Sequence, residues 1–226
     1  MTPWILLGSG QVPGNGGELR LYQRGSEFSI KIVGRGELMN SRVHGSEDAL
    51  AEQGCAGLAG HAAPRLLIGG LGMGFTLAAA LRQLDAQARV VVAELVPAVV
   101  EWNRGPLGAQ AGYPLQDPRV MVHEGDVARL LQAEPQAYDA ILLDVDNGPE
   151  GLTRKQNDWL YGINGLNAAY AALRPQGRLA VWSAGPDRDF LQRLRKVGFA
   201  VREVAVRGHG TRGARHIIWL ARRGGP

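Results

Sequence analysis

The chain has 226 residues, of which 45% are apolar and 20% are charged, and its formal net charge is +4. This length and composition fit one folded domain with at most a small appendage, and they argue against a disordered chain. No stretch reaches the roughly 18 consecutive apolar residues of a membrane span, and the N-terminal residues do not resemble a secretion signal. The one cysteine, Cys55, excludes an internal disulfide, and the five histidines lack ligand spacing. We therefore expect a cytoplasmic protein without a metal site and without a membrane partner.

The basic residues are concentrated toward the C-terminus. Residues 184–226 contain ten Arg and Lys against three Asp and Glu, a bias that is typical of segments that bind RNA or another polyanion. Only three of the 25 basic residues are lysines, however, and no aromatic residues alternate with the C-terminal arginines as in a base-stacking surface. We interpret the arginine excess as a general bias in the amino-acid composition of the chain. We therefore consider nucleic acid a less favoured partner than a small molecule.

The first sixty residues have the pattern of a small β structure. Residues 18–23 and 28–33 alternate polar and apolar side chains around a turn at 24–26, which predicts a β-hairpin, with a third strand possible after residue 36. Residues 46–52 predict a short helix with Ser46 as its N-cap and Gly54 near its end. We expect a small N-terminal β lobe over residues 1–60, packed on a larger domain over residues 61–226.

From residue 65 onward, apolar runs that suit buried parallel strands alternate with helical stretches. The expected strands are 65–68, 89–93, 120–123, 138–143 and 178–182, and the expected helices are 75–84, 96–103, 127–132, 158–173 and 190–197. Two further runs, 200–206 and 216–221, face each other across the loop 208–213. The pattern predicts a doubly wound, mostly parallel α/β sheet of seven strands with an antiparallel C-terminal hairpin.

A glycine-rich loop follows the first of these strands. Gly69, Gly70, Gly72 and Gly74 lie where a ligand binds in such sheets, beyond the carboxyl end of a strand. Phe75 stands where the dinucleotide fingerprint requires its third glycine, so the spacing suits adenosine with a short tail better than a pyrophosphate. The alternative is a glycine-rich turn between packed elements.

Acidic residues end the next two strands. Glu94 lies twenty residues beyond Gly74, where a carboxylate accepts hydrogen bonds from the two hydroxyls of a ribose; the alternative is an exposed acid at a strand end. Asp126 follows the third strand and either contacts an adenine amino group or caps the helix that begins at Val127.

Asp144 and Asp146 lie in a loop rich in turn-forming residues after the fourth strand. Two carboxylates this close repel each other, which raises the pKa of one of them unless a cation lies between them. Such an acidic pocket suits an amine substrate, and a carboxylate in it can take the ammonium proton before attack. The alternative is that both residues only cap and turn the backbone.

Together these residues resemble the spermidine synthase family, the polyamine aminopropyltransferases built on the class I methyltransferase fold. The resemblance covers roughly residues 18–185. It rests on the glycine loop 68–74, on Glu94 within 93–101, on residues 117–120 leading to Asp126, and on the acidic loop 143–146. It implies decarboxylated S-adenosylmethionine as donor, an adenine contact for Asp126, and Asp144 as the base that deprotonates the attacking amine. It also implies a homodimer.

The chain departs from the family pattern at three places. The family's glycine loop carries an aspartate that holds the amino end of the donor, whereas this chain has Leu71 and Gly72 at those positions. A tyrosine-histidine-glutamate stretch of the family is replaced by residues 46–48, and the two loop aspartates are two residues apart instead of three.

We therefore predict an aminopropyltransferase that acts on a polyamine or another amine. Two alternatives remain: methyl transfer from intact S-adenosylmethionine to a small molecule or RNA, and a nucleoside-binding protein without catalysis.

Overall fold

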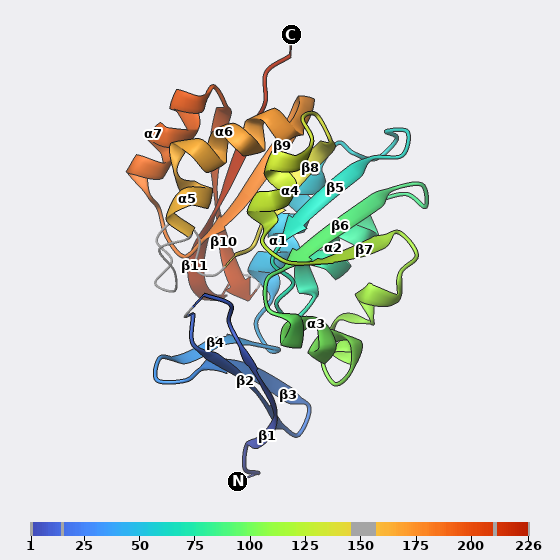
Figure 1. Cartoon of the computed structure of the whole chain (residues 1–226), viewed down its shortest axis with the longest axis vertical. Coiled ribbons are helices and arrows are strands. Elements are labelled where there is room, and N and C mark those ends of the chain that lie inside the picture. The colour runs from blue at the N-terminus through green and yellow to red at the C-terminus, as the bar shows by residue number, and fades with distance from the viewer. Residues whose placement is uncertain (1, 15, 146–156, 210–211, 226) are drawn as a thin grey trace.

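The computed structural model describes residues 2–14, 16–145, 157–209 and 212–225, which form two β-sheets and the helices around them (Figure 1). The smaller sheet is antiparallel in the order β1-β2-β3-β4. Its strands are β1 (Ile5–Gln11), β2 (Glu18–Arg24), β3 (Glu27–Ile32) and β4 (Gly36–Asn40). The predicted hairpin and third strand are confirmed as β2, β3 and β4.

The larger sheet has seven strands in the order β10-β11-β9-β8-β5-β6-β7. They are β5 (Arg65–Gly69), β6 (Arg89–Glu94), β7 (Val120–Glu124), β8 (Tyr138–Leu143), β9 (Leu173–Ser183), β10 (Ala200–His209) and β11 (Arg212–Arg222). The strands from β9 to β7 are parallel, and β11 pairs antiparallel with both β9 and β10. This confirms the predicted doubly wound sheet with an antiparallel C-terminal hairpin.

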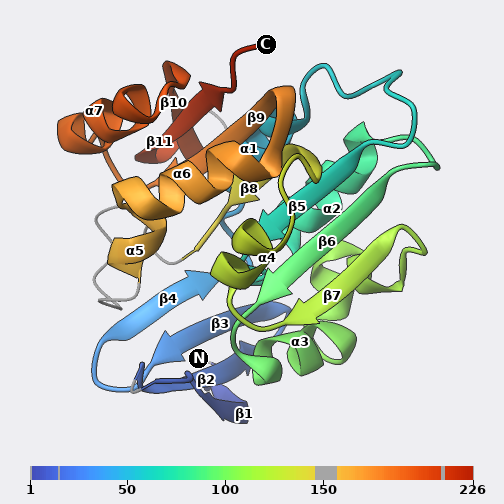
Figure 2. The ribbon, with the colours of Figure 1, turned by 45° about the horizontal axis from the view of Figure 1, so that its top comes forward.

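Helices cover both faces of the larger sheet. They are α1 (Gly45–Cys55), α2 (Phe75–Gln83), α3 (Pro97–Arg104), α4 (Val127–Ala133), α5 (Asn157–Tyr161), α6 (Ile163–Ala172) and α7 (Arg188–Val197), with 3-10 turns at Gly108–Ala111 and Pro114–Gln116. Figure 2 shows α4, α6 and α7 in front of the sheet and α1 and α2 behind it. None of the helices in the described ranges is long and apolar enough to cross a membrane.

Two predictions for these elements are wrong, and one strand is missed. Ser46 does not cap α1: the cap position is His44, without a side-chain capping hydrogen bond, and Ser46 and Gly54 both lie within the helix. The single helix expected over 158–173 is divided into α5 and α6, because Gly162 leaves the helical conformation with a ψ of 171°. The strand β1 has no counterpart among the predicted strands. It is one of the two edge strands of its sheet, and its side chains do not alternate between buried and exposed, since Ile5, Leu6 and Leu7 are all exposed.

The topology places the ends of the strands at one crevice. The chain leaves β5 toward β6 and β7 on one side and later returns to β8 and β9 on the other, so strand order reverses between β5 and β8. Ligands of open α/β sheets bind at such a reversal. In Figure 2 the arrowheads of β5, β6 and β7 point toward the N-terminal sheet, which therefore covers this crevice.

Candidate active site

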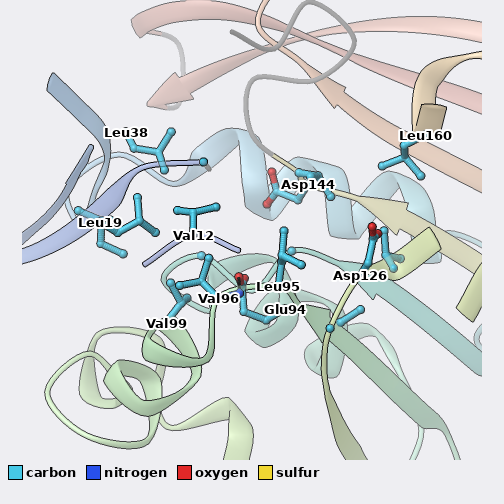
Figure 3. A pocket seen from close by; sticks show the side chains of 18 of the residues that line it. Val12, Leu19, Leu38, Glu94, Leu95, Val96, Val99, Asp126, Asp144 and Leu160 are labelled. Atoms are coloured by element: carbon cyan, nitrogen blue, oxygen red, sulfur yellow. Dashed lines mark hydrogen bonds between the residues drawn. The ribbon is translucent and has the colours of Figure 1, made fainter. Parts of the chain in front are cut away.

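A cavity of about 330 Å³ lies between the carboxyl ends of the strands and the N-terminal sheet (Figure 3). Among the described residues, its charged lining residues are Glu94, Asp126 and Asp144. The other lining residues come from the N-terminal region, the glycine loop and the ends of the strands: Val12, Gly16, Leu19, Ile30, Ile32, Leu38, Met39, Gly70, Gly72, Ala93, Leu95, Val96, Val99, Gly125, Val127, Ala128, Val145, Trp159 and Leu160. An apolar pocket with a few converging polar groups is the usual form of a small-molecule site.

The glycine loop has a backbone that only glycine adopts easily. Gly70, Gly72 and Gly74 have φ angles of 90°, 53° and 84°. A Cβ on Gly70 would lie 2.2 Å from the carbonyl oxygen of Asp144, so the loop and the end of β8 touch directly. Gly70 and Gly72 line the cavity, whereas Gly69 is the last residue of β5 and Gly74 precedes α2. The structure therefore brings two of the four predicted glycines to the cavity.

Glu94 is the last residue of β6 and is only 8% exposed. Its Oε2 accepts a hydrogen bond from the backbone N–H of Leu71 at 2.9 Å, and its Oε1 accepts one from Val96 at 2.8 Å. The alternative of an exposed acid is therefore wrong. These two backbone donors fix the carboxylate in place at the wall of the cavity.

Asp126 begins α4. Its Oδ1 accepts a hydrogen bond from the backbone N–H of Ala128 at 2.9 Å, which is the capping role considered from the sequence. The residue also lines the cavity, on the side away from the N-terminal sheet (Figure 3). Its contact with adenine stays a prediction.

Asp144 follows β8 at the opposite side of the cavity from Glu94 (Figure 3). Thr76 Oγ1 donates a hydrogen bond to Asp144 Oδ2 at 2.7 Å, and the backbone N–H of Asp144 donates to Gly69 O at 2.8 Å. Burial and, to a smaller extent, the negative charge of Glu47 raise the pKa of Asp144 to about 7, while the Thr76 hydrogen bond opposes both. Asp146, the second predicted catalytic residue, lies outside the described residues.

A second, smaller cavity of about 100 Å³ borders the first and shares Leu38, Met39, Gly72 and Asp144 with it. Glu47, in the first turn of α1, lines this smaller cavity. Burial raises the pKa of Glu47. From the sequence, Glu47 is predicted only to lie in a short helix, within the stretch 46–48 that differs from the family pattern. Nothing in the local sequence indicates that α1 brings it toward the end of β8.

The two aromatic residues that follow the acidic loop have different roles. Trp159 lines the larger cavity. Tyr161 is buried, donates a hydrogen bond to Val145 O at 3.1 Å and meets Phe190 edge to face at 5.8 Å between ring centroids. One residue is therefore a wall of the cleft and the other is an anchor in the core.

No protein-family model matches the chain, and no curated protein matches its sequence. Among solved structures it is similar to a spermidine synthase from Thermotoga maritima, with a TM-score of 0.75, 18% identity, and coverage of 97% of this chain and 73% of that one. A spermidine synthase in complex with the transition-state analogue AdoDATO gives a TM-score of 0.74, 17% identity, and coverage of 97% and 72%. An O-methyltransferase family protein from Burkholderia thailandensis gives a TM-score of 0.54, 18% identity, and coverage of 80% and 55%.

The similarity to the spermidine synthases extends over both sheets, whereas the O-methyltransferase family protein matches a smaller share of the chain. At these identities the comparisons establish fold and not activity. The chain therefore has the spermidine synthase-like fold, a class I methyltransferase-like sheet preceded by a small antiparallel sheet.

Proposed function

We propose that the protein transfers an aminopropyl group from decarboxylated S-adenosylmethionine to an amine. The observation that carries this proposal is the charge of the cavity walls. Within the described part of the chain, carboxylates line both cavities, while no Lys, Arg or His does. Such walls attract a sulfonium and an ammonium and repel the carboxylate of intact S-adenosylmethionine.

The nucleoside part of the donor is assigned to the larger cavity. Glu94 is proposed to accept hydrogen bonds from the ribose, since its carboxylate is held by two backbone N–H groups and lines the cavity. Asp126 is proposed to meet the adenine, and Gly70 and Gly72 allow close approach because they carry no Cβ. The 5′ substituent then extends toward Asp144.

Asp144 is proposed to act as the base. As a carboxylate it takes a proton from the ammonium of the acceptor, and the free amine attacks the methylene carbon beside the sulfonium. The N–C bond forms as the C–S bond breaks, and the electron pair of that bond stays on sulfur, so that methylthioadenosine leaves as a neutral thioether. A pKa of about 7 supports this assignment, because a base is most effective when its pKa is near the working pH.

The test combines binding with turnover. Calorimetric titration should show tighter binding of decarboxylated than of intact S-adenosylmethionine, and chromatography should detect methylthioadenosine after 1,4-diaminobutane is added with the decarboxylated donor. Preference for the intact donor would reassign the protein to methyl transfer. Binding of a nucleoside without release of methylthioadenosine, tested over several amines, would favour a non-catalytic binding protein.

A further inference from the structure

The smaller cavity continues the nucleoside cavity beyond the glycine loop. The two share Gly72 and Asp144 at their junction, and the smaller one extends from there to Glu47 of α1 and Trp182 of β9. With the ribose at Glu94 and the base toward Asp126, this junction is where the 5′ substituent of a bound nucleoside would leave the larger cavity. The smaller cavity is therefore placed to receive the end of the donor's tail.

The glycine loop offers no charged group to that tail. Gly72 has a φ of 53°, and a Cβ built on it would lie 3.3 Å from the sulfur of Met39. The thioether of Met39 thus fills the space that a side chain at position 72 would enter. Leu71 and Met73, the neighbours of Gly72, also line the cavity and are apolar.

Of the residues that the structure describes, two with carboxyl groups line the smaller cavity, and they differ in their surroundings. Asp144 accepts a hydrogen bond from Thr76 and is the proposed base. Glu47 Oε2 accepts a hydrogen bond from Ser46 Oγ at 2.6 Å, and no described cation forms an ion pair with it. Burial raises the pKa of Glu47 because an unpaired carboxylate is costly away from water. A cation bound beside Glu47 would remove that cost.

The basic side chains at the start of α1 and on α2 are already engaged by another acid, Asp48. Asp48 Oδ2 lies 2.7 Å from His44 Nδ1, and Asp48 Oδ1 accepts a hydrogen bond from Arg82 at 2.9 Å. The negative charge of Asp48 raises the pKa of Glu47, and His44 lowers it. Within the described residues, Glu47 is thus a carboxyl at the cavity wall without an ion pair, while His44 and Arg82 are bound to Asp48.

The start of α1 is held firmly in place. Gly45 packs against the backbone of the β10–β11 hairpin, where a Cβ would lie 2.9 Å from the carbonyl oxygen of Gly208. Ser46 and Leu50 are buried on the same helix. Glu47 is therefore held by the packing of Gly45 before it and by the buried residues Ser46 and Leu50 of the same helix, as the rigid placement of a binding group requires.

We propose that Glu47 binds the ammonium group at the end of the donor's aminopropyl tail, and that it thereby selects a donor whose tail has no carboxylate. This inference rests on the proposed function and adds to it a residue that determines donor specificity. It leaves Asp144 free to act on the acceptor.

The experiment compares two nucleosides that differ in the tail. Decarboxylated S-adenosylmethionine carries the ammonium and a positively charged sulfonium, whereas methylthioadenosine lacks the whole aminopropyl group and its sulfur is a neutral thioether. Calorimetric titration of each into the wild type, E47Q and the control E52Q gives the contribution of Glu47 to tail binding. Glu52 is an exposed glutamate of the same helix, so E52Q removes one charge from α1 without reaching the cavity.

We expect E47Q to weaken binding of decarboxylated S-adenosylmethionine by about 10- to 100-fold, the cost of losing a charge-assisted hydrogen bond at a partly buried site. Binding of methylthioadenosine should change by less than about 2-fold, since it makes no contact with Glu47, and E52Q should leave both affinities unchanged. E47Q should also reduce the discrimination against intact S-adenosylmethionine, because it removes a repelling charge. The unfolding temperature of each variant shows that it is folded.

Three results would overturn the inference. If E47Q lowers the affinity for both nucleosides equally, or for neither, Glu47 does not bind the tail. If D144N in place of E47Q produces the loss that is specific to the tail, Asp144 is the anchor. If the wild type binds methylthioadenosine but gains nothing from the tail, the inference about Glu47 fails while the nucleoside site stands; if it binds neither nucleoside, the proposed function fails as well.

Discussion

Replacement of Asp144 by asparagine should stabilise the protein while removing its activity. Burial and the charge of Glu47 raise the pKa of Asp144 from 3.8 to about 7. A pKa difference of one between the folded and unfolded states corresponds to about 1.4 kcal/mol, so the ionised carboxylate costs the folded state at most about 4 kcal/mol. Asparagine is neutral, nearly the same size, and able to accept the hydrogen bond from Thr76.

The pH dependence gives the sign of the effect. A carboxyl whose pKa is raised on folding binds its proton more tightly in the folded state, so its cost is fully present above pH 7 and disappears as the pH falls toward 3.8. Urea unfolding followed by tryptophan fluorescence should therefore show D144N more stable than the wild type at about pH 8, one unit above the raised pKa. The difference should shrink steadily as the pH is lowered through the raised pKa toward the ordinary one.

The same variant should lose about 100- to 10,000-fold in turnover, the usual contribution of a general base. D189N, which changes an exposed aspartate in the first turn of α7, is the matched control: it should leave turnover unchanged and lower the free energy of unfolding by less than about 1 kcal/mol, through the lost interaction with the helix dipole. A stability difference that is the same at every pH, or a D144N variant that is less stable than the wild type in alkaline buffer, would refute the account of Asp144 as a buried and destabilising carboxylate.

Three further variants test the rest of the site. G70A should destabilise the protein by more than about 2 kcal/mol in urea unfolding, because its Cβ would lie 2.2 Å from a carbonyl oxygen, whereas G25A, with φ also positive but open space around it, should cost about 1 kcal/mol. E94Q should lower the affinity for methylthioadenosine by about 10- to 100-fold in calorimetry, since the amide replaces one acceptor oxygen by a donor; unchanged affinity would exclude Glu94 from the ribose site. D126A should lower the free energy of unfolding by about 1 kcal/mol, because it removes the acceptor of the capping hydrogen bond from Ala128 N–H. D126N keeps an acceptor for that bond and should lower the affinity for methylthioadenosine in calorimetry; unchanged affinity would exclude an adenine contact for Asp126.

The fold could be predicted because its buried parallel strands stand out as short apolar runs. Runs such as those of β5 and β8 are covered on both faces, so their side chains are apolar almost without exception. Strand β1 lacks that signal because it is an exposed edge, and its pairing with β2 is decided by tertiary contact. The division between α5 and α6 depends on Gly162. A single glycine in a helical pattern can lie inside a helix or end it, so the sequence does not decide between the two.

In the candidate site too, residues at the ends of predicted strands can be identified from the sequence, whereas a residue that only tertiary packing brings to the cavity cannot. Glu94 and Asp144 can be found from the sequence because Glu94 ends a buried strand and Asp144 follows one, and the ends of parallel strands meet at one edge of a sheet. Glu47 cannot be found in this way because it lies on a helix that precedes that sheet in the chain, and only the packing of α1 brings it to the cavity.

The N-terminal sheet and the larger sheet share one continuous hydrophobic core, which includes Leu21 and Ile30 on one side and Leu50 and Ile68 on the other. The nucleoside cavity lies within the seam between these two parts, and Leu19 and Ile30 belong both to its wall and to that core. If the proposed donor binds there, it would contact both sheets and would stabilise the packing of one on the other. At about 100 times its dissociation constant such a ligand adds about 2.7 kcal/mol to the free energy of unfolding. Removal of the N-terminal strands would leave the apolar side chains of α1 and the larger sheet facing water, so the small sheet is part of the folding unit as well as of the binding site.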